Sequence, residues 1–228
     1  MDDGPKSWEE SLGMARLASE DGIKYAFATP HWLQGSRMAP SPELIREKVE
    51  HLNRLVSGAG LDYRVFPGME IGMCENLPSL LEAGKVLPLG DSNYILIETP
   101  FISIPLGMGK LLFSLKSIGI NPVLAHPERN MNIQRKPGIA AEMVEKGALL
   151  QINASSLCGG NGEGAKRCSV EFAKMGLIHA LASDGHSTEW RPPKMSDGIR
   201  ALAGIVGDEG ADELVRASLE MFVDSASN

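Results

Sequence analysis

Polar side chains able to bind metal ions or transfer protons follow short apolar runs at five places in this 228-residue sequence. These side chains are those of His31, Glu70, Glu98, His126 followed by Arg129, and Asp184 with His186. In a parallel α/β sheet the carboxyl ends of all strands lie at one face, where ligands and catalytic residues gather. We therefore expect these residues, although far apart in the sequence, to converge on one pocket.

Imidazoles mixed with carboxylates suit Mn, Fe or Zn, and a bridging carboxylate can hold two such ions close enough for two-metal catalysis. A single His or Glu at a strand end is more often a hydrogen-bonded loop residue than a ligand. Five strand ends of this kind in one chain favour a metal centre. Of the other histidines, we interpret His51 as part of a solvated helix face and expect a packed or supporting role for His179.

Other catalytic schemes lack their residues in this sequence. A cysteine-dependent tyrosine phosphatase needs an arginine six residues after its cysteine, and Cys74, Cys158 and Cys168 are followed at that spacing by other residue types. A P-loop and a G-x-S-x-G nucleophile elbow are also missing from the sequence. These observations favour metal-dependent chemistry over nucleophilic catalysis by a side chain.

Apolar runs alternate with amphipathic stretches along the whole chain. Strands are expected over residues 24–28, 63–66, 94–97, 122–125, 149–152 and 180–182. Helices are expected over residues 7–20, 42–56, 76–83, 106–118, 139–145, 165–175, 197–206 and 208–223. This alternation predicts an α/β fold with a parallel sheet, open or closed into a barrel. Without an obvious linker or repeat, residues 1–228 are expected to form one domain.

Composition excludes several classes of function. The net charge of −7 argues against a nucleic-acid surface, which needs clustered Lys and Arg to replace counterions. Three cysteines without CxxC spacing suggest reduced thiols, and therefore a cytoplasmic protein. An apolar run long enough to span a membrane and a signal peptide are both missing from the sequence, so membrane insertion is not expected.

Several motifs, in order, resemble the PHP-domain tyrosine phosphatases of bacterial capsule and exopolysaccharide operons (CpsB/CapC-like). The resemblance runs essentially from end to end. Its specific pieces are Asp2-Asp3-Gly4, Ala28-Thr29-Pro30-His31, Pro67-Gly68-Met69-Glu70-Ile71, Ile97-Glu98, His126-Pro127-Glu128-Arg129, Asn153-Ala154-Ser155-Ser156-Leu157, Ser183-Asp184-Gly185-His186 and Arg191-Pro192-Pro193.

This resemblance implies a distorted (β/α)7 barrel holding up to three divalent metal ions. Manganese is the first expectation, with iron, zinc or magnesium as alternatives. By the same resemblance the ligands fall into three sites: Glu70, Glu98 and His126; Asp3, His31 and His186; and Asp184 with a bridging Glu70. Arg129 and Arg191 are similar to the phosphate-binding arginines of the family.

One departure from the family concerns the start of the chain. Members open with an Asp-x-His-x-His strand just before Asp-Asp-Gly, whereas here Met1 directly precedes Asp2 and Asp3. The first strand and two metal ligands are therefore expected to be missing, and this form is expected to be weakly active.

The function that the resemblance implies is hydrolysis of phosphotyrosine in a protein, with a tyrosine autokinase of polysaccharide export as the implied partner. A metal-activated hydroxide would attack phosphorus, Arg129 would stabilise the equatorial oxygens, and Asp184 or His186 would protonate the leaving oxygen. Two alternatives are a small-molecule phosphatase acting on a substrate such as histidinol phosphate, and a truncated, inactive domain that only binds the kinase.

Overall fold

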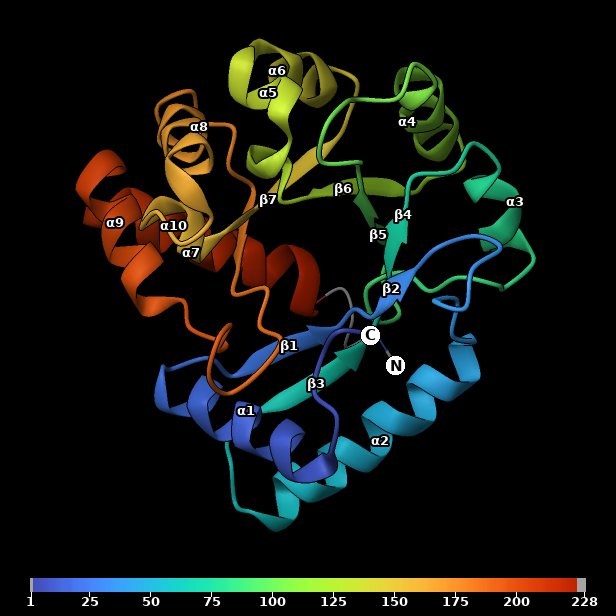
Figure 1. The fold of residues 1–228 in the computed structure, drawn as a ribbon, viewed down its shortest axis with the longest axis vertical. Coiled ribbons are helices and arrows are strands. Elements are labelled where there is room, and N and C mark those ends of the chain that lie inside the picture. Colours follow the sequence, from blue (N-terminus) through green and yellow to red (C-terminus); the bar gives the residue numbers. More distant parts are fainter. Residues whose placement is uncertain (1, 225–228) are drawn as a thin grey trace.

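A curved parallel sheet surrounded by helices makes up the fold (Figure 1). The structure, a computed structural model, describes residues 2–224. Its strands are β1 (Tyr25–Ala28), β2 (His31–Trp32), β3 (Arg64–Pro67), β4 (Glu70–Gly72), β5 (Tyr94–Glu98), β6 (Asn121–Ala125), β7 (Leu149–Asn153) and β8 (Ala180–Ala182). Strands β2, β4, β5, β6, β7 and β8 pair in that order, and β1 pairs with β3.

The pairs β1–β3 and β2–β4 are two parts of one longer strand pair, separated by an interruption. In β1–β3, Tyr25 is opposite Arg64, and in β2–β4, His31 is opposite Glu70; both pairs are 39 residues apart, so the register does not change. Proline at position 30 has no N–H to continue the ladder. Its carbonyl oxygen accepts a hydrogen bond from Glu70 N at 3.1 Å, which restarts the pairing.

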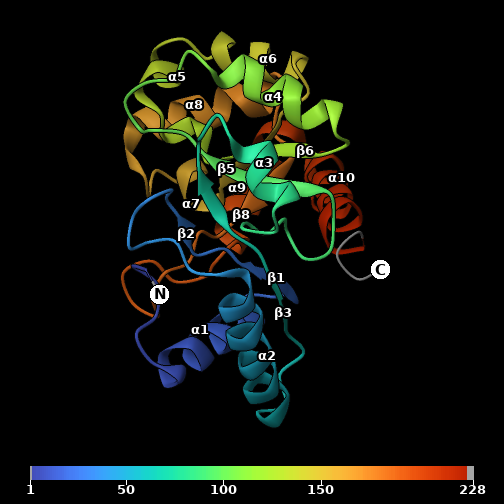
Figure 2. The same cartoon turned by 90° about the vertical axis from the view of Figure 1, so that its right-hand side faces the viewer.

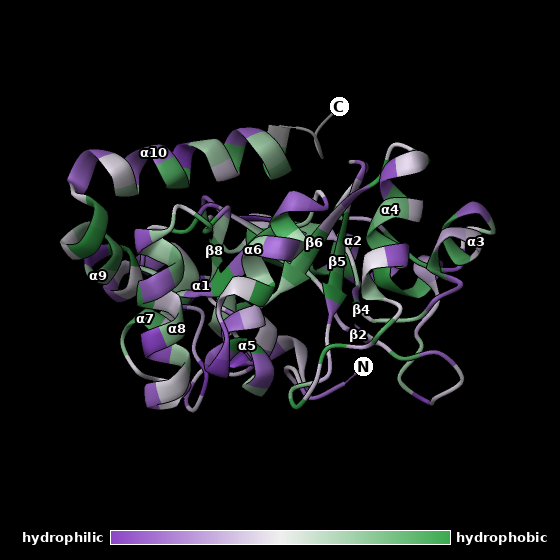
Figure 3. Ribbon diagram, turned by 90° about the horizontal axis from the view of Figure 1, so that it is seen from above, coloured by the Kyte–Doolittle hydropathy of each residue, from purple (hydrophilic) through white to green (hydrophobic). Residues whose placement is uncertain are grey.

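The central strands are apolar on both faces. Strands β5, β6 and β7 are buried along most of their length. This pattern is typical of parallel strands covered by helices on one face and by a closed interior on the other. Figure 3 shows hydrophobic strands enclosed by helices that carry more hydrophilic residues.

Helices connect successive strands and have recognisable ends. They are α1 (Trp8–Glu20), α2 (Pro42–Gly58), α3 (Leu77–Glu82), α4 (Met108–Ser117), η1 (Pro127–Arg129), α5 (Met131–Arg135), α6 (Gly138–Glu145), α7 (Ala154–Leu157), α8 (Gly162–Lys174), α9 (Ser196–Val206), α10 (Asp208–Leu219) and η2 (Glu220–Asp224). The hydroxyl of Ser7 accepts from Glu10 N at 3.1 Å and caps α1, as expected for a capping box. Within residues 2–224, every helix is too short or too polar to cross a membrane.

The two outer strands of the sheet, β1 and β8, line the same cavity. This cavity has a volume of about 820 Å³ and is lined by Ala26–Ala28 of β1 and by Ala180–Ala182 of β8. Leu96, Val123 and Phe222 also line it. The curvature of the sheet therefore brings its two ends to opposite sides of one mostly apolar space. Figure 2 shows β1 and β8 from the side.

The α/β fold with a parallel sheet is confirmed, and each expected strand overlaps an observed one. The sequence placed His31 and Glu70 after the expected strands at residues 24–28 and 63–66, but it did not predict that these residues themselves lie in strands. Each begins a short second strand, β2 or β4, because the ladder resumes after Pro30 and Gly68. The short helices η1, α5 and α7 were not expected from the periodicity.

His179 joins β7 to β8 through a hydrogen bond that its neutral ring must accept. Leu150 N donates to His179 Nδ1 at 3.1 Å, and burial lowers the pKa of His179. The unfolded chain therefore takes up a proton as the pH falls through about 6.5, before the folded chain does, so this contribution to stability is present above pH 6.5 and lost below it. Urea unfolding at pH 7 and pH 5 should show a smaller loss of stability in His179→Gln than in the unaltered chain. An equal loss would contradict this role.

Candidate metal centre

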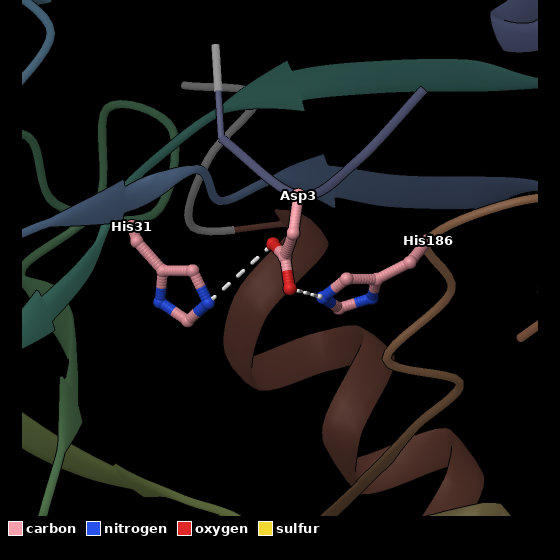
Figure 4. Close-up of side chains that lie close together, drawn as sticks. All are labelled: Asp3, His31 and His186. Atoms are coloured by element: carbon pink, nitrogen blue, oxygen red, sulfur yellow. Dashed lines mark ion pairs between the residues drawn. The ribbon is translucent and has the colours of Figure 1, made fainter. Parts of the chain in front are cut away.

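Asp3 joins two histidines from distant parts of the chain. Its Oδ1 is 3.7 Å from His31 Nε2 at the start of β2, and its Oδ2 is 3.4 Å from His186 Nε2 in the loop after β8. Figure 4 shows the carboxylate lying between the two rings. The Asp3 side chain is 52% exposed, whereas that of His186 is 12% exposed, so this group opens to solvent on the Asp3 side.

A second group lies on the other side of His31. His31 Nδ1 is 3.6 Å from Glu98 Oε2, at the end of β5. His126 Nε2 is 2.8 Å from Glu70 Oε1 and 3.8 Å from Glu98 Oε1. Glu70 and His126 are buried, with side chains only 8% and 5% exposed.

His31 belongs to both groups through its two ring nitrogens. One donor atom from each of Asp3, His31 and His186 lies within 4.8 Å of the others, and the same holds for His31, Glu70 and Glu98. The family resemblance placed His126, rather than His31, with the two glutamates. In the structure His126 contacts Glu70 directly, so His31, Glu70, Glu98 and His126 form one continuous cluster.

The cluster brings carboxylates close together, and their mutual repulsion raises the electrostatic free energy unless positive charge lies between them. Burial, and then the neighbouring charge of Glu70, raise the pKa of Glu98. Burial acts to lower the pKa of His126, but the hydrogen bond and charge of Glu70 outweigh it, and the pKa is raised. Positive charge between these carboxylates is therefore favourable. A divalent cation would supply that charge.

The backbone is strained at two of these residues. His126, with φ of 32°, and Asp184, with φ of 51°, are the two non-glycine residues of the described chain that have positive φ. This left-handed region is unfavourable for side chains with a Cβ and is enriched at functional sites. Each residue follows a strand, β6 or β8, so the sharp bend turns its side chain toward the cluster.

Two arginines contact the same carboxylate oxygen of Asp184. Arg129 Nη1 is 3.2 Å from Asp184 Oδ2, and Arg191 Nη2 also contacts that oxygen. Asn153 Nδ2 donates to the same oxygen at 2.6 Å. The two guanidinium groups therefore lie close enough to bind one anion together. The third grouping expected from the resemblance, Asp184 with a bridging Glu70, stays a prediction.

A buried glutamate holds Asn153 in place. Glu128 is fully buried, and its Oε1 accepts from Asn153 N at 3.1 Å and from Ser156 Oγ at 2.7 Å. Burial raises the pKa of Glu128. Among the described residues, its Oε2 is a buried oxygen without a hydrogen-bond partner. This network ties η1, which carries Arg129, to the end of β7.

Sequence reasoning missed three residues that support the site. Asp2 Oδ2 accepts from His31 N at 2.9 Å and thereby fixes the segment that carries Asp3. Glu128 and Asn153 were recognised as parts of motifs, but no role was assigned to them. Their signal in the sequence was polar character within otherwise apolar surroundings, which predicts hydrogen bonding but not the partner.

The donor set fits divalent cations. Three imidazoles and three carboxylates from six separate segments meet within ion-pair distance. Mixed nitrogen and oxygen donors of this kind suit Mn, Fe and Zn better than Ca. All the metal-ligating residues expected from the sequence lie in or beside this cluster. The Oδ2 atom of Asp184 is held by the arginines, while its Oδ1 is 3.6 Å from His186 Nδ1.

Comparison with known proteins points to one family. The family model for capsular polysaccharide synthesis, CpsB/CapC, matches residues 1–223. The tyrosine-protein phosphatase YwqE of Bacillus subtilis is 36% identical over 209 residues, covering 92% of this chain and 82% of that protein. The tyrosine-protein phosphatase CpsB of Streptococcus pneumoniae is 29% identical over 223 residues, covering 94% and 90%. A crystal structure from a study of these two proteins, there called unique metal-dependent tyrosine phosphatases, superposes with a TM-score of 0.93 at 34% identity, covering 99% and 91%.

Proposed function

Because the chain belongs to the CpsB/CapC family of capsular polysaccharide synthesis, we propose that it is a metal-dependent protein-tyrosine phosphatase. The main support for this proposal is the cluster of imidazoles and carboxylates, which lies beside two arginines that contact the same carboxylate oxygen of Asp184. The cluster provides ligands for cations, and the arginines provide a site for a phosphate dianion.

In this proposal Glu70, Glu98 and His126 hold one part of the metal centre, and Asp3, His31 and His186 hold the other, with His31 lying next to both. Cations bound there would make hydroxide available near neutral pH and offset charge on the phosphate. Manganese is the metal that we propose, as the family resemblance implies, and mixed imidazole and carboxylate donors are compatible with it. The chemistry of the donors alone also permits iron, zinc or magnesium.

The chain's own polar residues would bind and orient the substrate. Arg129 and Arg191 take the phosphate oxygens and stabilise the charge that spreads over them during in-line displacement. Asp184, fixed by Asn153, keeps the two guanidinium groups together before substrate arrives. Asp184 and His186, the expected proton donors to the leaving oxygen, are engaged here as the carboxylate between the arginines and as a proposed metal ligand, so proton donation is a minor part of the proposal. Phenolate, with a pKa of about 10, needs this proton less than an alkoxide does.

The fold supports a barrel arrangement for the whole chain. We propose that residues 1–228 form one metallophosphoesterase domain and that the curved sheet is a distorted (β/α)7 barrel. A seventh strand position would lie between β1 and β8, because both strands line the same apolar cavity of about 820 Å³. Among residues 2–224, the outer edges of β1 and β8 pair with no other strand, and such edges are suited to accept one extended segment.

The proposed substrate is a phosphotyrosine in a protein, and a tyrosine autokinase of polysaccharide export is the proposed partner. The family's role in capsule synthesis and the phosphatase names of its relatives support this choice. A panel containing a phosphotyrosine peptide and histidinol phosphate tests it, with faster turnover of the peptide expected.

Chelation tests the requirement for metal. Turnover of p-nitrophenyl phosphate should fall to background after exhaustive EDTA treatment and should return when Mn²⁺ is added in excess. Zn²⁺ or Mg²⁺ added in parallel would show which ion restores the higher rate. Turnover that survives complete removal of metal, verified by elemental analysis, would sink the metal-dependent mechanism.

A further inference from the structure

Two exposed aromatic side chains lie against the candidate site, and each ring packs against one arginine of the site. Phe101, in the loop after β5, is 45% exposed, and Trp190, in the loop after β8, is 64% exposed. Arg129 Cζ is 4.7 Å from the centre of the Phe101 ring, and Arg191 Cζ is 5.4 Å from that of Trp190. Both arginines also contact Asp184.

The same rings also touch the histidines of the cluster. The Phe101 ring is stacked on His126 with centroids 5.9 Å apart and an interplanar angle of 16°. The Trp190 ring meets His186 edge-on, also at 5.9 Å. Each aromatic side chain is therefore in contact with one arginine and one histidine of the site, which places both at its rim.

Both loops are held by hydrogen bonds although the rings face solvent. The carbonyl oxygen of Phe101 accepts from Met131 N at 2.7 Å, and that of Pro100 accepts from Asn130 Nδ2 at 2.6 Å. On the other side, the buried hydroxyl of Ser187 accepts from Trp190 N at 3.1 Å and from Arg191 N at 3.3 Å. Exposed apolar rings kept in fixed positions beside polar groups are typical of ligand contacts rather than of core packing.

We infer that Phe101 and Trp190 contact the phenyl ring of the substrate and so select aryl over alkyl phosphates. This inference rests on the proposed function, because the arginines must hold the phosphate for the ring to lie at this rim. When Arg129 and Arg191 bind the phosphate, the phenyl group of phosphotyrosine lies next to the two aromatic rings that pack against those arginines. A phosphoserine side chain has no ring to fill that position, and so gains no aromatic contact.

Binding of stable phosphonates to the Mn²⁺-loaded protein separates ring recognition from catalysis. Benzylphosphonate stands in for an aryl phosphate and ethylphosphonate for an alkyl phosphate, and neither is hydrolysed. Isothermal titration should show tighter binding of benzylphosphonate to the unaltered chain. Phe101→Leu and Trp190→Leu should each reduce the preference for benzylphosphonate by about 3- to 10-fold, the usual effect of one aromatic contact.

Matched variants decide what each result means. Phe113→Leu, which alters a 72% exposed phenylalanine on α4, should leave the preference unchanged, and Trp190→Phe should keep most of it because a ring remains. Equal weakening of both phosphonates in the leucine variants, or no preference in the unaltered chain, would overturn the inference. Hydrolysis is scored separately: a chain that prefers benzylphosphonate without turning over p-nitrophenyl phosphate keeps the inference and refutes the proposed function.

Discussion

Replacing Glu70 by glutamine is expected to remove bound metal and to lower p-nitrophenyl phosphate turnover more than about 100-fold. Changes to residues that merely support a metal ligand cost 10- to 100-fold, so loss of a ligand should exceed that range. Glu70 is buried, lies 2.8 Å from His126 and raises the pKa of Glu98 by its charge. Its carboxylate is thus central to the cluster, and an amide cannot supply the negative charge.

The measurement combines steady-state rates with metal-dependent thermal stability. Because cations bind the folded chain only, Mn²⁺ should raise the melting temperature of the unaltered protein. This increase should vanish in Glu70→Gln. Glu82→Gln, at an exposed position on α3, serves as the control and should behave like the unaltered chain. A Glu70→Gln variant that retains both the Mn²⁺ effect and the activity would show that Glu70 is not a ligand.

Replacing Arg129 or Arg191 by lysine is expected to lower kcat/KM by about 100- to 1,000-fold, the usual effect of removing one donor to the transition state. Lysine keeps the charge but cannot form two parallel hydrogen bonds to a phosphate or lie flat on an aromatic ring. Arg129 lies over Phe101 and Arg191 over Trp190, so both features are lost in the variants.

Metal content distinguishes this effect from loss of the metal centre. Both lysine variants should bind as much Mn²⁺ as the unaltered chain, since neither arginine is a metal ligand. The control Arg135→Lys, at an exposed position in α5, should keep full activity. If Arg129→Lys and Arg191→Lys turned over p-nitrophenyl phosphate at the original rate, the phosphate-binding role of the arginines would be wrong.

The sequence was sufficient to predict the elements that have a strong hydrophobic pattern. Strands β5, β6 and β7 are continuous apolar runs, and their ends place Glu98 and His126 at the carboxyl face. The break in the first strand pair was not predictable in the same way. Pro30 indicates a stop, but only the pairing of His31 with Glu70 shows that the ladder resumes.

Polar contacts between distant segments are the part of the site that local patterns do not encode. Asp3 and Glu98 lie next to different ring nitrogens of His31. The position of Asp3 depends on its neighbour Asp2, which accepts a hydrogen bond from His31 N. The stacking of Phe101 and Trp190 on the arginines likewise depends on loop hydrogen bonds. Hydrophobic periodicity carries no information about these contacts, because they involve few apolar residues.

A crystal of the protein soaked in Mn²⁺ tests the central claim most directly. Anomalous difference density should show ions bonded to side chains of Glu70, Glu98 and His126, and to those of Asp3, His31 and His186. Ion–ligand distances of about 2.0–2.2 Å are expected for a divalent transition metal on nitrogen and oxygen donors. Manganese bound only elsewhere, or no anomalous density between these side chains at saturating Mn²⁺, would contradict the account.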